Sequence, residues 1–196
     1  MTAKALLSDQ VDEREIRVIL RELETVLKND IPGDVVELGC YVGTTSVFLA
    51  SRLKTTGRKL YLYDSFEGLP PKTTEDESPA GMQFTTGELL ATKKQLIRNL
   101  KQANVPMPVI KKGWFSDLTA ADVPPRIAFA FLDGDYYHSV WDSLTLISNF
   151  LAPGATIIVD DYANEALPGA AKAVDTWLKT NPGRLVIEHS LAIIHT

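Results

Sequence analysis

The sequence predicts an α/β fold of the Rossmann-like type, with a mostly parallel sheet of seven strands and helices on both of its faces. Short apolar runs of strand length alternate with segments in which apolar residues recur every three or four positions. The last two runs are joined by only His189 and Ser190, a connection that fits an antiparallel hairpin. The 196 residues contain no linker or repeat, so we expect a single domain over residues 1–196.

The composition disfavours several classes of function. Hydrophobic residues make up 45% of the chain and charged residues 23%, values typical of a globular protein. The net charge of −5 repels phosphate backbones and anionic lipid, and no run approaches the ~20 apolar residues of a membrane span. We therefore expect neither nucleic acid nor a membrane as partner. A single cysteine, Cys40, and a start without the apolar core of a secretory signal predict a cytoplasmic location.

The first predicted element is a helix over residues 12–29, within an N-terminal helical segment at residues 1–30. Apolar residues recur there at helical spacing, and Asp12 with Glu15 three positions later is typical of a capping box. We expect this helix to cover one face of the sheet. A second role in closing a pocket is left open.

Strand-length apolar runs define the predicted sheet. They lie at residues 35–38, 59–63, 109–110, 127–132, 156–159, 184–188 and 191–194. After the second run, residues 71–87 are poor in large apolar side chains and rich in turn formers. Ligands of α/β proteins bind at the carboxyl ends of the strands, so we predict that residues 71–87, here called the lid loop, cover such a site.

A glycine-containing turn after the first strand predicts a cofactor site. Gly39 and Gly43 stand four positions apart, and Tyr41 occupies the place of the middle glycine of a dinucleotide fingerprint, which disfavours NAD. The turn also lacks the lysine of a triphosphate-binding loop. With Glu37 beneath it, the turn suits a nucleoside without a diphosphate, and S-adenosylmethionine fits that description.

Residues after the next two strands add to this cofactor site. Asp64 ends the second strand 21 residues after Gly43, a spacing at which an acid can hydrogen-bond both hydroxyls of a ribose. A cap for the following element explains Asp64 equally well. Trp114 and Phe115 follow the third strand and could stack on adenine, although burial explains them nearly as well.

Carboxylates follow two consecutive strands of the predicted sheet. Asp133 and Asp135 come after residues 127–132, and Asp160 and Asp161 come after residues 156–159. Because parallel strands end at one edge of a sheet, these like charges should converge and either take up protons or bind a cation. Oxygen ligands alone favour Mg²⁺, Mn²⁺ or Ca²⁺. Any one aspartate could be an ordinary cap, but two pairs at neighbouring strand ends favour a metal site.

Several longer segments resemble the macrocin O-methyltransferase family of class I S-adenosylmethionine-dependent methyltransferases. The resemblance extends over residues 34–177 and lies in the loop at 37–43, DSFEGLP at 64–70, KGWF at 112–115, LDGDYYHS at 132–139 and DDY at 160–162. It implies a Mg²⁺-dependent transfer of a methyl group to a hydroxyl of a small molecule. Chelation would require vicinal oxygens on that acceptor, such as those of a sugar or another secondary metabolite.

The resemblance also implies roles for single residues. Asp133, Asp160 and Asp161 would hold Mg²⁺. Asp135 would act as the base, with His138 as the second candidate because an acidic residue is expected at that position. Asp64 would bind the cofactor ribose, with Ser65 and Phe66 beside the adenosine. Together with the turn after the first strand and the aromatic residues after the third, the predicted cofactor contacts are Glu37, Gly39, Tyr41, Gly43, Thr44, Asp64, Ser65, Phe66, Trp114, Phe115 and Asp133.

Two further expectations concern partners and alternatives. The chain is shorter before the first strand than the family pattern, so part of the acceptor pocket could be absent or could be supplied by a second copy in a homo-oligomer. The alternative function is a non-catalytic S-adenosylmethionine-binding partner or sensor module. The acidic residues argue against that alternative, because a non-catalytic relic has no need of repelling carboxylates.

Overall fold

The computed structural model describes residues 6–196, so the first five residues of the predicted N-terminal helical segment lie outside the described part. The helices are α1 (Glu13–Lys28), α2 (Thr44–Leu53), α3 (Lys93–Gln102), α4 (Tyr137–Ser148) and α5 (Pro168–Leu178). The strands are β1 (Asp34–Leu38), β2 (Leu60–Asp64), β3 (Val109–Lys112), β4 (Ile127–Leu132), β5 (Leu151–Val159), β6 (Arg184–Glu188) and β7 (Leu191–His195). Short 3-10 helices lie at η1 (Thr74–Asp76), η2 (Pro79–Gly81) and η3 (Phe115–Asp117).

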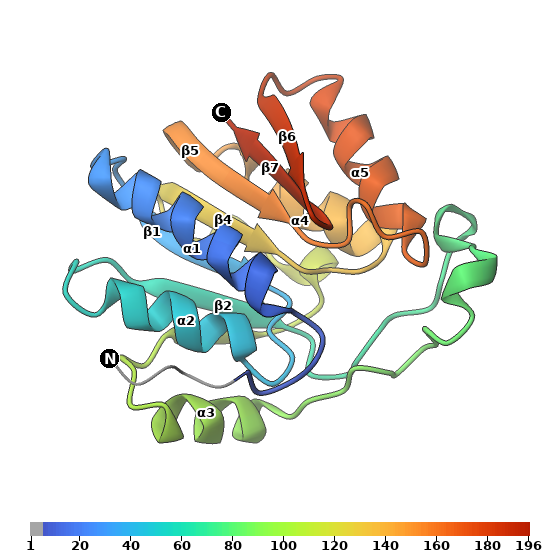
Figure 1. The fold of residues 1–196 in the computed structure, drawn as a ribbon, viewed down its shortest axis with the longest axis horizontal. Coiled ribbons are helices and arrows are strands. Elements are labelled where there is room, and N and C mark those ends of the chain that lie inside the picture. The colour runs from blue at the N-terminus through green and yellow to red at the C-terminus, as the bar shows by residue number, and fades with distance from the viewer. Residues whose placement is uncertain (1–5) are drawn as a thin grey trace.

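The seven strands form one sheet in the order β3-β2-β1-β4-β5-β7-β6 (Figure 1). All neighbouring pairs are parallel except those made by β7, which runs antiparallel to both β5 and β6. The predicted mostly parallel sheet with one reversed strand is therefore confirmed. In the C-terminal hairpin, β7 lies between β5 and β6, so β6 is the edge strand.

Strand β5 is longer than predicted, because it begins at Leu151 and not at residue 156. Pro153 and Gly154 lie in its first half, and both are residues that usually mark turns. The pairing of β5 with β4 shifts register in this stretch, which accommodates them without ending the strand.

Helices cover both faces of the sheet, as predicted. Helices α1, α2 and α3 pack on one face, and α4 and α5 pack on the other (Figure 1). Successive strand residues contribute to opposite faces: Val35 of β1 packs with the first group of helices and Val36 with the second. Both residues are fully buried. The sheet therefore lies between two apolar layers that hold its strand ends in place.

Helix α1 begins with the predicted capping box. Asp12 Oδ1 accepts the amide of Glu15 at 2.9 Å, and Glu15 Oε2 accepts the amide of Asp12 at 2.9 Å. Its bounds agree with the predicted helix at residues 12–29, since Asp12 and Asn29 are the caps. None of the helices in residues 6–196 is long and apolar enough to cross a lipid bilayer.

Candidate active site

The site lies where the parallel strands end. A cavity of about 190 Å³ opens at this edge of the sheet, the edge at which open α/β sheets bind their ligands. Residues at or just after the ends of five strands line it: Gly39 and Tyr41 after β1, Asp64 at the end of β2 and Ser65 after it, Gly113, Trp114 and Phe115 after β3, Asp133, Gly134 and Asp135 after β4, and Asp161 and Asn164 after β5. The fold thus gathers short turns that are far apart in the sequence.

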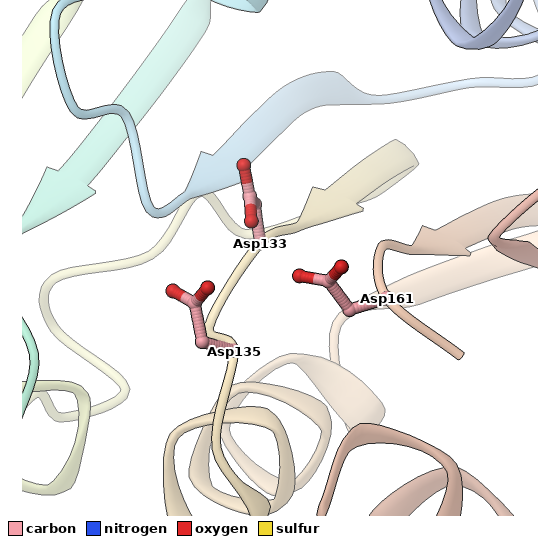
Figure 2. A group of neighbouring side chains, drawn as sticks. All are labelled: Asp133, Asp135 and Asp161. Carbon is pink, nitrogen blue, oxygen red and sulfur yellow. The ribbon is translucent and has the colours of Figure 1, made fainter. Parts of the chain in front are cut away.

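Three carboxylates surround a common space in this cavity. Asp133 and Asp135 come from the turn after β4, and Asp161 comes from the turn after β5 (Figure 2). One oxygen of each carboxylate lies within 4.8 Å of the other two. Asp135 and Asp161 both have φ values of +59°, in the left-handed region that side chains other than glycine seldom adopt. These two turns are therefore bent so that the side chains face one another.

The electrostatics of this group favour a cation. Burial, with the neighbouring charges of Asp135 and Asp161, raises the pKa of Asp133 well above its ordinary value. Burial and the charge of Asp161 likewise raise the pKa of Asp135. Neither lysine, arginine nor histidine lines the cavity in the described part of the chain. A group of oxygens with unbalanced negative charge fits a hard divalent cation.

Asp160, predicted as a metal ligand, lies outside the cavity lining and outside this group of three. Its Oδ1 lies 3.0 Å from Ser190 Oγ and accepts the amide of Asp161 at 2.8 Å. The same hydroxyl of Ser190 contacts Glu15 in α1. Asp160 therefore does not line the cavity, and Asp135 completes the group of three in its place. The left-handed backbone at Asp161 and the hydrogen bond from Ser190 to Asp160 decide which of these two consecutive side chains lines the cavity.

The turn after β1 is fixed by its neighbours. A Cβ on Gly39 would lie 1.8 Å from the carbonyl oxygen of Asp133, so this position needs glycine for the two turns to pack together. Asp64 Oδ2 accepts the amides of Cys40 and Tyr41 at 2.8 and 3.1 Å. Its Oδ1 accepts the amide of Phe66 at 2.7 Å. Asp64 thus joins the turns after β1 and β2, in addition to facing the cavity.

The remaining residues predicted for the cofactor divide into two groups. Those that line the cavity are Gly39, Tyr41, Asp64, Ser65, Trp114, Phe115 and Asp133. Those that do not line it are Glu37, Gly43, Thr44 and Phe66. His138, the second candidate base, also lies outside the lining, exposed in the first turn of α4 with its ring against that of Tyr137.

Glu37 lies beneath the cavity floor and not in it. Its side chain is 1% exposed, and its Oε2 has no hydrogen-bond partner among the described residues. Burial, opposed by hydrogen bonding with Ser46 and assisted by the charge of Asp64, raises the pKa of Glu37 to about 8. A buried carboxyl without a cation beside it is most stable when it is protonated.

Several lining residues had no signal in the sequence. Asp9 and Gln10 reach the cavity from the segment before α1, and Phe84 and Leu89 reach it from the lid loop and the residues just after it. These segments reach the edge of the sheet through the tertiary fold, which local sequence patterns do not predict. The sequence suggested a pocket-closing role near α1, but it named neither Asp9 nor Gln10.

The fold and the site together define the class of protein. The chain superposes on the O-methyltransferase NovP with a TM-score of 0.80 and 25% identity, over 93% of this chain and 79% of that one. It also superposes on CalS11, a calicheamicin methyltransferase, with a TM-score of 0.78 over 94% and 80% of the two chains. The identity is 18% there, so this second likeness concerns the fold alone. The fold is that of a class I methyltransferase.

The sequence comparisons identify the family. Residues 10–185 match the family described as macrocin-O-methyltransferase (TylF), and the chain belongs to this family of methyltransferase enzymes. A tetracenomycin-C rhamnosyl 4'-O-methyltransferase of Streptomyces olivaceus is 32% identical over 152 residues, which cover 74% of this chain and 58% of the relative. The mycinamicin III 3''-O-methyltransferase of Micromonospora griseorubida is 31% identical over 79% of this chain and 64% of its own length. The chain thus spans about three fifths of these relatives.

Proposed function

We propose that the chain is an S-adenosylmethionine-dependent O-methyltransferase that requires Mg²⁺ or a similar divalent cation. Its acceptor would be a hydroxyl of a small molecule with vicinal oxygens, such as a sugar or another secondary metabolite. The observation that carries the proposal is the group of Asp133, Asp135 and Asp161 around one space, in a cavity that also contains the predicted cofactor turn. The names of two relatives, which methylate sugar-bearing natural products, support the acceptor class.

The cation would lie between Asp133 and Asp161, which belong both to the predicted ligand set and to the observed group. Asp160 would have to turn away from Ser190 before it could join them. When bound, a divalent cation lowers the pKa of an acceptor hydroxyl and fixes its orientation. The chain contributes a partly buried, negatively charged cavity in which that charge is balanced.

Asp135 is the proposed base. It lies in the cavity beside the other two carboxylates, whereas His138 lies outside the lining. A positioned carboxylate can take the proton of the acceptor hydroxyl, an effect of roughly 10²- to 10⁴-fold on the rate. The left-handed backbone at Asp135 holds this side chain toward the site.

The cofactor would lie against the turns after β1, β2 and β3. Tyr41, Trp114 and Phe115 provide aromatic surface, and Ser65 provides a hydroxyl. A carboxylate has about four acceptor positions, and backbone amides use three of those on Asp64, so one remains for a ribose hydroxyl. Asp64 can therefore act as a cap and also accept one ribose hydroxyl, where its spacing in the sequence predicted two.

The charge of the cavity favours an uncharged acceptor. Five aspartates line it: Asp9, Asp64, Asp133, Asp135 and Asp161. A bound cation and the positive cofactor offset only part of that negative charge, and no basic side chain among the lining residues would hold a phosphate. Phe84 and Leu89 form an apolar part of the wall, which suits the apolar portion of a glycoside.

Methyl transfer to a panel of neutral rhamnosides and catechols, followed as S-adenosylhomocysteine formation, tests this proposal. We expect turnover with Mg²⁺ and its loss in a chelator, with restoration when Mg²⁺ is returned. Equal turnover in metal-free buffer would contradict the metal requirement. Cofactor binding without transfer to any member of the panel would favour the sensor module. The cytoplasmic location and the homo-oligomer stay predictions.

A further inference from the structure

The lid loop contains a buried charge that the proposed reaction does not use. Asp76, in η1, is 1% exposed. Its Oδ2 accepts the amide of Thr73 at 3.0 Å and the hydroxyl of Thr73 at 2.8 Å. Its Oδ1 accepts the amide of Tyr137, 61 residues away, at 2.7 Å. A buried carboxylate is costly unless such donors surround it, so the position of this side chain is strongly determined.

The bond to Tyr137 caps a helix that has no cap of its own. Tyr137 is the first residue of α4, and the N-cap residue Tyr136 makes no side-chain hydrogen bond to the helix. A carboxylate at this end accepts one of the free amides and interacts favourably with the helix dipole. Asp76 therefore serves α4 as an N-cap from a distant segment.

The packing at this point leaves room for nothing larger than glycine. A Cβ on Gly169, in the first turn of α5, would lie 1.9 Å from Asp76 Oδ1 and 2.6 Å from the amide nitrogen of Tyr137. Three segments therefore meet here: the lid loop, the start of α4 and the start of α5. In Figure 1 the lid loop, in green, extends from the end of β2 to the side of α5.

Further contacts connect the lid loop to the same turn and its surroundings. The hydroxyl of Tyr136 donates to the carbonyl oxygen of Phe84 at 3.1 Å, and Phe84 lines the cavity. The hydroxyl of Ser78 donates to the carbonyl oxygen of Glu165 at 2.6 Å. Tyr136 directly follows Asp135, so the lid loop holds the chain immediately after the proposed base.

We propose that Asp76 is a positioning residue that fixes the lid loop to the turn carrying Asp135. The lid loop is then a fixed cover of the cavity, and Asp76 sets the position of the base through the first turn of α4. The catalytic part of this inference rests on the proposed function. The structural part, that Asp76 connects the two segments, does not.

Three variants test the inference. Asp76→Ala removes both acceptors, whereas Asp76→Asn keeps an oxygen for the Tyr137 amide, because asparagine caps helices nearly as well as aspartate. Thr74→Ala is the matched control: Thr74 lies in the same 3-10 helix and is exposed, and within residues 6–196 its hydroxyl donates only to the neighbouring Glu75. Hydrogen exchange at the Tyr137 amide, S-adenosylhomocysteine affinity, and kcat and KM with the most active panel acceptor are measured.

We expect Asp76→Ala to speed exchange at Tyr137 by about tenfold or more. We expect kcat to fall by about tenfold or more while cofactor affinity changes less than about threefold, since Asp76 contacts the turn that carries the base and none of the turns proposed to bind the cofactor. Asp76→Asn should recover only part of kcat, because its amide nitrogen cannot accept the Thr73 amide, and Thr74→Ala should match the wild type. Unchanged exchange in Asp76→Ala would overturn the connection. Faster exchange with an unchanged kcat would overturn the positioning role. If the wild type transfers no methyl group, the proposed function fails, and the exchange measurement still decides whether Asp76 fixes the lid loop.

Discussion

Asp133 and Glu37 belong to adjacent strand ends, since the amide of Asp133 donates to the carbonyl of the residue after Glu37, yet their surroundings differ. Burial raises the pKa of both carboxyls. Asp133 faces a cavity together with two other carboxylates, whereas Glu37 is buried beneath the turn, outside the cavity lining. A cation shared with the other carboxylates can stabilise the ionised form of Asp133. For Glu37, burial is compensated only when the carboxyl takes up a proton. A raised pKa alone therefore does not identify a catalytic carboxyl; the geometry of its neighbours does.

The largest expected effect is a loss of kcat, and it distinguishes Asp135 inside the cavity from His138 outside it. We expect Asp135→Asn to lower kcat by roughly 10²- to 10⁴-fold, because the amide cannot accept the proton of the acceptor hydroxyl. His138→Gln should change kcat by less than about twofold, because His138 lies outside the cavity. Steady-state kinetics of the two variants check this. A larger loss in His138→Gln than in Asp135→Asn would reverse the assignment of the base.

The next effect concerns Glu37 and its proton. The pKa of about 8 in the folded state lies above the ordinary value of 4.5, so folding favours the protonated carboxyl. The stability that this group contributes is fully present below pH 4.5 and is lost as the pH rises toward 8, at about 1.4 kcal/mol per unit. Glu37→Gln should therefore be more stable than the wild type at pH 8 by up to a few kcal/mol.

Urea unfolding from pH 5 to pH 8 measures this difference. The free energy of unfolding of Glu37→Gln should depend less steeply on pH than that of the wild type, with a similar value near pH 5. Parallel curves for the two proteins would mean that Glu37 is ionised in the folded state, and the contrast with Asp133 would then be lost.

The smallest effect tests whether Asp160 belongs to the structure around the site and not to the site itself. Ser190→Ala removes the hydroxyl between Asp160 and Glu15 and should cost about 1–3 kcal/mol of stability. Activity is measured at a temperature at which the variant is folded. There we expect kcat to fall by less than about fivefold, since Asp160 does not line the cavity. A loss of activity as large as that of Asp135→Asn would return Asp160 to the metal site.

Most of the fold could be predicted from local pattern. The strands and α1 follow from periodicity and from the capping residues Asp12 and Glu15, which depend on neighbours in sequence. The start of β5 could not, because Pro153 and Gly154 are tolerated there only through an irregular pairing with β4.

The site was predictable to the level of strand ends. Parallel strands bring Asp133 and Asp161 to one edge, and this follows from topology alone. Which of two consecutive aspartates enters the cavity depends on the left-handed backbone at Asp161 and on Ser190, which holds Asp160. Asp76 gave no signal, because its partner Tyr137 lies in another segment of the chain.

Titration with Mn²⁺, followed by the loss of the free-ion signal in electron paramagnetic resonance, tests the central claim most directly. The wild type should bind one Mn²⁺, and Glu37→Gln should bind it with the same affinity. Asp161→Asn should weaken binding by about tenfold or more, because it removes one of the three carboxylates around the common space. Equal affinity in the wild type and Asp161→Asn, or an equal loss in Glu37→Gln, would contradict a cation site built by this group.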